Sequence, residues 1–163
     1  MRRLLHAAAN PRPGPPVPSR REQVLALAPR LTEGVAAWRD PEAVGRAVCG
    51  WVTGSLETAT EPGHAVFVAE LGGRIAGVVT VAEKAHFTGQ VDAYVGELAV
   101  AAGSARRGVA TQLMSAVDAW AAQRGLAFVT LETGAANEPA RNLYAGLGFL
   151  DEDVRLTKPV AGA

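Results

Sequence analysis

Residues 97–111 combine an apolar strand, a short turn and the start of a helix, and this combination constrains the fold most. The turn carries two arginines, Arg106 and Arg107, directly before Gly108. Free backbone N–H groups and the positive end of the helix dipole favour an anion at such a helix start. The segment therefore predicts a phosphate-binding turn; the alternative is a solvated arginine pair before an ordinary helix.

The chain after this turn predicts a helix, a strand and a second, shorter helix. Apolar residues recur at helical spacing over residues 107–124, and an apolar strand that we expect to be buried on both faces follows over 126–132. A strand, a right-handed helical crossover and a strand place residues 95–100 and 126–132 parallel to each other. Asn137 is expected to cap the last helix, and residues 149–158 are expected to form a final strand.

The chain before the turn predicts two helices followed by an antiparallel meander. Residues 19–31 and 41–56 show helical spacing, and Trp51 is expected on the buried face of the second helix. Period-two patterns then favour three strands joined by short loops, over residues 64–70, 75–83 and 91–100. Together these patterns predict a mixed α/β (α+β) fold.

Composition limits the function classes. The 163 residues are 48% apolar, and 16 basic residues balance 16 acidic ones. A zero net charge disfavours a generally basic nucleic-acid binder, and no apolar run approaches the length of a membrane span, so we expect neither nucleic acid nor membrane as a partner. The single cysteine, Cys49, excludes an intrachain disulfide and suits a reducing cytoplasm, where we expect the protein to be located.

The domain organisation follows from the prolines. Five of the ten prolines lie between residues 10 and 19, which predicts a proline-rich N-terminal tail over residues 1–19. One domain is expected over 20–158, and residues 159–163 are expected to be a C-terminal tail.

Two local signatures, at this separation and in this strand–helix context, resemble the GNAT superfamily of acetyl-CoA-dependent N-acetyltransferases. The first runs from Glu97-Leu98-Ala99-Val100 into residues 106–114, and the second covers residues 137–149. The resemblance extends over residues 20–158. It implies a central, mostly antiparallel sheet with about four flanking helices and one parallel strand pair that splays at the cofactor site. The family's usual N-terminal strand has no confident counterpart here.

The resemblance implies acetyl-CoA as the acetyl donor and no metal. At the family's pyrophosphate turn, Gly108 and Ala110 match, whereas Ala105 stands where the family has Gln or Arg. Because the family binds pyrophosphate mainly through backbone N–H groups, this departure is expected to weaken binding rather than abolish it. Pantetheine is expected in the gap between residues 97–100 and 127–132, which a small bulge would open. The implied cofactor-binding residues are Leu98, Ala99, Val100, Arg106, Arg107, Gly108, Val109, Ala110, Thr111, Asn137 and Ala140.

The resemblance also implies direct attack by an amine in a ternary complex. Tyr144 stands at the position of the family's thiolate-protonating tyrosine; a packed structural tyrosine is the alternative. Glu97, a lone acid inside an apolar strand, is the best candidate for the base that accepts the amine proton, and it is expected to share a strand face with Val95 and Ala99. It could instead bind the acceptor or lie at a solvated face. The other candidates for the base are Glu83, His86 and Asp92.

The sequence thus favours an N-acetyltransferase with a primary amine acceptor. A non-catalytic acyl-CoA-binding or sensing module on the same fold is the alternative. A nucleotide-binding domain is disfavoured because neither GxGxxG nor GxxxxGK[ST] is present. The acceptor is a small-molecule or peptide amine, walled by residues 34–40 and 84–92, and the protein is expected to be a monomer or a homodimer.

Overall fold

The computed structural model describes residues 18–160, so most of the expected N-terminal tail lies outside the described residues. The strands are β1 (His64–Leu71), β2 (Arg74–Ala85), β3 (Val91–Val100) and β4 (Val129–Leu131). The helices are α1 (Arg20–Leu25), the 3-10 helix η1 (Ala28–Thr32), α2 (Pro41–Glu57), the 3-10 turn η2 (Ala102–Ser104), α3 (Val109–Gln123) and α4 (Glu138–Gly146). None of these helices is long and apolar enough to cross a bilayer.

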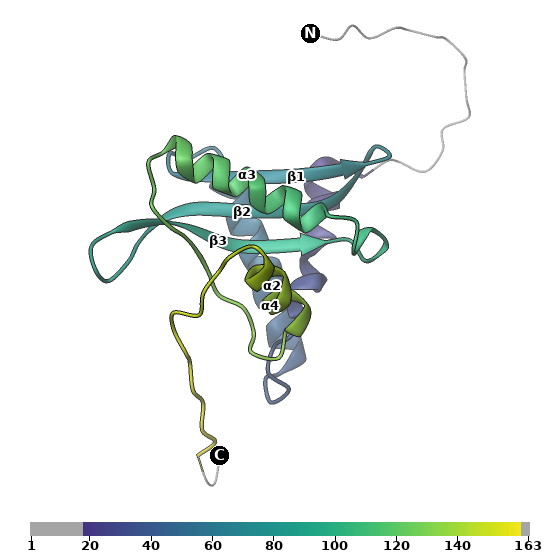
Figure 1. Ribbon diagram of the computed structural model, residues 1–163. Helices are drawn as coiled ribbons and strands as arrows, with labels where there is room; N and C mark the ends of the chain where they lie inside the picture. The colour runs from purple at the N-terminus through teal and green to yellow at the C-terminus, as the bar shows by residue number, and fades with distance from the viewer. Residues whose placement is uncertain (1–17, 161–163) are drawn as a thin grey trace, which may run out of the picture.

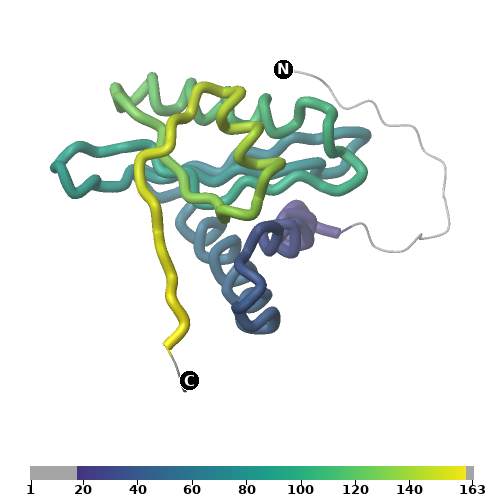
Figure 2. Tube along the Cα trace, turned by 60° about the horizontal axis from the view of Figure 1, so that its bottom comes forward, coloured from purple at the N-terminus to yellow at the C-terminus, as the bar shows by residue number. Residues whose placement is uncertain are grey.

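One mixed sheet with helices on both faces organises the fold (Figure 1). The strand order is β1-β2-β3-β4; β1–β2 and β2–β3 are antiparallel, and β3–β4 is parallel. Figure 2 shows α3 on one face of the sheet and the α1–α2 region on the other. The expected meander, the helical crossover and the mixed α/β fold are therefore confirmed.

Each face of the sheet packs its own apolar cluster. On the α3 face, Val79 and Val95 pack with Leu113 and Val117 of the helix. On the α1–α2 face, the sheet packs against both helices through a second set of buried side chains: Val24, Val48, Val52, Ile75, Val78 and Ala99. The face on which a β3 side chain lies therefore determines which helices it contacts.

The N-terminal helical segment is divided in two. A capping box between Ser19 and Glu22 starts α1, which ends at Leu25. Pro29 follows in the first turn of η1, and it lacks the N–H that a continuous α-helix would need. The expectation of one helix over residues 19–31 was therefore wrong in its length, although both pieces form.

The expected burial of Trp51 was wrong. Its side chain is 55% exposed, whereas Val48 and Val52 are each 1% exposed. These two valines stand four residues apart on the same helix face, and Trp51 is rotated about 100° from Val52. The helix therefore buries its valine stripe and leaves the indole in solvent.

The C-terminal part of the sheet is smaller than expected. β4 has three residues, all half-buried, so the prediction of a strand buried on both faces over residues 126–132 was wrong. β4 is an edge strand, and only β3 pairs with it. The strand expected over residues 149–158 is not formed; this segment has no helix or strand, and Leu150 and Leu156 are almost fully exposed. A three-residue edge offers little backbone for a further strand to pair with.

Candidate active site

A gap opens where β3 and β4 part. Their parallel pairing covers only Ala93–Val95 opposite Val129–Leu131. β3 continues to Val100, whereas the chain after β4 turns away towards α4 (Figure 1). The splayed parallel pair expected from the sequence is therefore present.

A β-bulge in β3 accompanies the splay. Val79 lies opposite Leu98, but Val81 lies opposite Val95, so three residue steps on β3 face two on β2. The extra residue falls at Gly96 in the segment just before Glu97. Such a bulge bends its strand and increases the local twist, which separates β3 from β4 beyond Val95. The small bulge that the resemblance implied is therefore found at the start of the gap.

The bulge also changes the face on which Glu97 lies. Val95 packs in the cluster under α3, whereas Ala99 packs in the cluster under α1 and α2. Glu97 contacts Ser55 of α2, so it lies on the α1–α2 face. The expectation that Glu97 shares a face with Ala99 is confirmed, and the expectation that it shares one with Val95 was wrong because the extra residue inverts the alternation.

Beyond the bulge, alternate residues of β3 direct their backbone N–H and C=O groups into the gap. Ala101 donates from its N–H to the carbonyl of Ala76 at 2.8 Å, which directs this residue towards β2. By alternation, Leu98 and Val100 direct their N–H and C=O groups away from β2, into the gap. Ala99 does not: its backbone faces β2, and its side chain is buried in the cluster under α1 and α2.

The turn before α3 leaves helix donors open. Gly108 is the N-cap, with φ 76°, and no side chain among the described residues caps the helix. The N–H groups of the first turn, at Val109, Ala110 and Thr111, have no partner within the helix. A Cβ added at Gly108 would meet nothing within 4 Å, so the space beside these donors is open. The arrangement fits a phosphate group.

The two arginines of this turn stand at its surface. Arg106 adopts a left-handed backbone conformation with φ 58°. Arg106 and Arg107 are both exposed, and neither forms an ion pair with another residue in 18–160. Their guanidinium groups are therefore available to an anion at Gly108.

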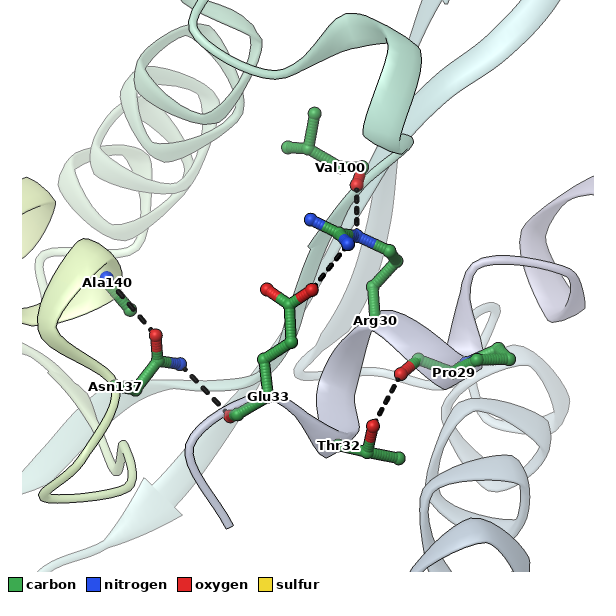
Figure 3. Close-up of polar contacts among 7 residues, drawn as sticks. All are labelled: Pro29, Arg30, Thr32, Glu33, Val100, Asn137 and Ala140. Carbon is green, nitrogen blue, oxygen red and sulfur yellow. Dashed lines mark hydrogen bonds and ion pairs between the residues drawn. The ribbon is translucent and has the colours of Figure 1, made fainter.

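The η1 region bridges the two sides of the gap, as Figure 3 shows. Arg30 donates from Nε to the Val100 carbonyl at 3.1 Å and forms an ion pair with Glu33. On the other side, Asn137 donates from Nδ2 to the Glu33 carbonyl at 3.2 Å. The Oδ1 of Asn137 accepts the Ala140 N–H at 3.3 Å, which confirms the expected N-cap of α4. One short turn thus links the end of β3 to the start of α4.

This bridge depends on a close approach of two loops. A Cβ added at Gly34 would overlap the Cβ of Asn137, and one added at Gly134 would overlap the carbonyl oxygen of Gly34. Glycine therefore allows the segment after η1 to touch the segment before α4. Residues 34–40 were predicted to wall the acceptor site, whereas Arg30 and Glu33 were not predicted, because isolated charged residues carry no spacing signal.

Glu97 is held by two hydroxyl groups that were not predicted from the sequence. Glu97 is 6% exposed, and Ser55 donates from Oγ to the Glu97 Oε2 at 2.8 Å. Thr80 donates from Oγ1 to the same oxygen and accepts the Glu97 N–H at 3.0 Å. The available signal was the lone polar residue on an apolar face: Thr80 lies among valines, and Ser55 follows Val48 by seven residues on one helix face.

The other candidates for the base lie at the far end of β3 from the gap. Glu83 and Asp92 flank the β2–β3 turn, and the gap begins only after Val95. Glu83 pairs with Arg124 at 3.2 Å, and His86 lies 3.6 Å from Glu152. Asp92 is 6% exposed, and its Oδ1 has no partner among the described residues. Of the four acids and bases considered, Glu97 is the one next to the gap.

Tyr144 lies on α4, on the side of the gap opposite β3. Its side chain is half-buried and meets the Phe149 ring edge to face, with ring centres 5.6 Å apart. Burial raises the pKa of the Tyr144 phenol above its ordinary value of 10. The phenol is therefore protonated at neutral pH and can serve as a proton donor.

Solved structures share this fold. AAC(6')-Iy, in complex with the bisubstrate analogue CoA-S-monomethyl-acetylneamine, is 20% identical with a TM-score of 0.63, covering 87% of this chain and 92% of that one. A GCN5-related N-acetyltransferase from Ralstonia eutropha JMP134 is 22% identical with a TM-score of 0.62, covering 88% and 91%. These likenesses bear on the fold alone.

A third solved structure is an aminoglycoside acetyltransferase, meta-AAC0020, from an uncultured soil metagenomic sample. In its complex with sisomicin it is 17% identical with a TM-score of 0.59, covering 85% of this chain and 87% of that one. A comparison with curated proteins gave no match.

The family model extends the resemblance to the sequence itself. The model described as "Acetyltransferase (GNAT) family" matches residues 4–149, which is most of the chain and includes the bulge, the Gly108 turn and α4. The protein is therefore an acyltransferase that belongs to the GNAT acetyltransferase family.

Proposed function

We propose that the protein transfers an acetyl group from acetyl-CoA to a primary amine by direct attack in a ternary complex. One observation carries the proposal: the splayed gap brings the inward-facing backbone of Leu98 and Val100 between the open helix start at Gly108 and the buried carboxylate of Glu97. An anionic cofactor and a cationic acceptor would thus meet from opposite faces of the sheet.

The donor side is formed by the turn before α3. The N–H groups at Val109, Ala110 and Thr111 would hold the pyrophosphate, with Gly108 allowing its close approach. Arg106 and Arg107 would add charge-assisted contacts from the surface. Acetyl-CoA supplies the acetyl group as a thioester when bound.

Within the gap, different groups of the chain would carry out the separate steps of acetyl transfer. The N–H groups of Leu98 and Val100 would stabilise negative charge on the acetyl oxygen. Amines are mostly protonated at neutral pH, so Glu97 would accept a proton from the attacking amine. Tyr144 would then donate its phenolic proton to the departing thiolate. Cys49 is exposed on α2 and has no part in this scheme.

The acceptor is a small-molecule or peptide amine. The aminoglycoside acetyltransferases among the similar structures support testing aminoglycosides first. The buried carboxylate of Glu97 beside the gap suits a cationic acceptor.

Replacement of Tyr144 tests the catalytic assignment. We expect Tyr144→Phe to lower kcat about 100-fold, the lower range for loss of a general acid, while acetyl-CoA affinity by calorimetry is unchanged. Tyr94→Phe alters the chain's other tyrosine and serves as the matched control. Acetyl-CoA binding without turnover for any amine would instead support the non-catalytic module.

A further inference from the structure

We propose that Thr80 and Ser55 are positioning residues that fix the Glu97 carboxylate so that its Oε1 oxygen faces the acceptor amine. The proposal rests on the proposed function, because it assigns these residues to the group that accepts the amine proton. It goes further in naming which oxygen does so and which side chains on two other elements determine this.

Thr80 ties the backbone and the side chain of Glu97 together. It occupies the β2 position that the bulge skips, between Val79 and Val81, where the strand register shifts. Its Oγ1 accepts the Glu97 N–H at 3.0 Å and donates to Glu97 Oε2. A hydroxyl has one donor and two acceptor sites, so both bonds form at once. The bulge N–H is thereby satisfied, and the side-chain rotamer of Glu97 is restrained.

Ser55 adds a second donor from a different element. Its Oγ donates to the same Oε2 at 2.8 Å. Val48 and Val52, each 1% exposed, fix this helix face against the sheet. Two hydroxyls from β2 and α2 therefore hold one carboxylate oxygen, and no described side chain hydrogen-bonds to Oε1. That oxygen is left for a proton from the substrate.

Gly96 leaves little space beside the Thr80 hydroxyl. A Cβ added at Gly96 would lie 3.0 Å from Thr80 Oγ1, which is tighter than ordinary contact. Glycine at the bulge thus lets the threonine hydroxyl reach Glu97. A Cβ at position 96 would require the hydroxyl to shift by a few tenths of an ångström.

Core packing does not explain a threonine here. Its neighbours Val78, Val79 and Val81 are all buried valines, and valine has nearly the same shape as threonine. Burying a hydroxyl is unfavourable unless it is hydrogen-bonded, so the apolar neighbours alone would favour a valine at this position. The bonds to Glu97 are what the hydroxyl provides and a methyl group would not.

Thr80→Val and Ser55→Ala test the proposal with the full-length protein. Loss of one hydroxyl is expected to lower kcat about tenfold, less than Glu97→Gln, for which about 100-fold is expected from loss of a general base. KM for acetyl-CoA is expected to stay unchanged, because neither residue lies at the Gly108 turn. The acidic limb of the kcat–pH profile is expected to move to higher pH as a donor to the carboxylate is lost. Thr80→Ser restores the hydroxyl and is expected to recover most of kcat.

Ser115→Ala is the matched control for Ser55→Ala. Ser115 is also a helical serine, and its Oγ donates to the Thr111 carbonyl on the exposed side of α3. Its kcat and pH profile are expected to equal those of the wild type. Should Thr80→Val fail to fold, as judged by circular dichroism, the kcat and pH profile of Ser55→Ala decide the question.

Two results would overturn the proposal, and they differ from failure of the base assignment. If Glu97→Gln lowers kcat but Thr80→Val and Ser55→Ala keep the wild-type kcat and pH profile, the positioning role is wrong and the base assignment stands. If Thr80→Ser is as impaired as Thr80→Val, the hydroxyl is not what matters. If Glu97→Gln itself keeps the wild-type kcat, the base assignment fails.

Discussion

Arg30 and Val100 are joined by a hydrogen bond of 3.1 Å, from the guanidinium Nε to the backbone carbonyl, across seventy residues of sequence. The bond fixes the end of β3 where β4 no longer pairs with it. Because the same turn holds Asn137 through the Glu33 carbonyl, the width of the gap depends on η1 as well as on the sheet.

Loss of the Arg30 side chain is expected to destabilise the fold. Arg30→Met removes a part-buried charged hydrogen bond and an ion pair, so we expect a loss of about 1 kcal/mol, discounted because the side chain is one-third exposed. For a chain of this length that corresponds to a fall in Tm of about 3 °C. Arg46→Met is the control, since Arg46 pairs with Glu42 at the surface, and its Tm should change by less than about 2 °C. If calorimetry shows the same fall in Tm for Arg30→Met and Arg46→Met, the stabilising role of the Arg30 bridge is contradicted.

A side chain at the helix start is expected to weaken cofactor binding. In Gly108→Ala a Cβ enters the open space beside the first-turn donors, and the left-handed backbone costs about 1 kcal/mol. The Kd for acetyl-CoA should therefore rise about tenfold or more. Gly103→Ala is the control: Gly103 lies five residues before Gly108 at an open position, and the variant should bind acetyl-CoA as the wild type does. Unchanged binding by Gly108→Ala in calorimetry would place the pyrophosphate elsewhere.

The two arginines of the turn are expected to assist rather than dominate. Exposed charge contacts contribute about 0.2–1 kcal/mol each, so Arg106→Gln and Arg107→Gln should each raise the Kd for acetyl-CoA by a few-fold at most. Because salt screens exposed charges, the difference from the wild type should shrink as ionic strength rises. Titrations at two salt concentrations measure this, and a larger effect than that of Gly108→Ala would mean that the backbone is not the main ligand.

The sequence predicted the parts of the site that local patterns determine. The Gly108 turn, the Asn137 cap and the β3–α3–β4 crossover each have a short-range signature, and each forms as expected. The position of Glu97 was less predictable, because one extra residue in a strand reverses the faces of all residues beyond it.

Long-range contacts left no such signature. Ser55 and Thr80 meet Glu97 from two other elements, and Arg30 reaches β3 from the N-terminal region. The C-terminal strand expected over residues 149–158 was also not formed, because a segment becomes a strand only where a partner strand pairs with it. Single polar residues on apolar faces were the one sequence clue to the Glu97 network.

The stability of the protein is expected to fall at alkaline pH through Tyr144. Burial raises the pKa of this phenol in the folded protein above the value of about 10 that it has when unfolded. Its stabilising contribution is therefore complete below about pH 10 and is lost as pH rises through the folded pKa. Denaturant unfolding from pH 8 to 11 should show a steeper loss for the wild type than for Tyr144→Phe, and identical slopes would argue against a buried neutral phenol.

Acetyl transfer itself is the most direct test of the proposed function. The measurement is thiol release from acetyl-CoA by the purified full-length chain with a panel of aminoglycosides, polyamines and short peptides, with the products identified by mass spectrometry. We expect amine-dependent thiol release, an acetylated amine as the product, and strongly reduced turnover in Tyr144→Phe and Glu97→Gln. Acetyl-CoA binding with no acetylated product from any amine, or wild-type turnover in both variants, would contradict the account.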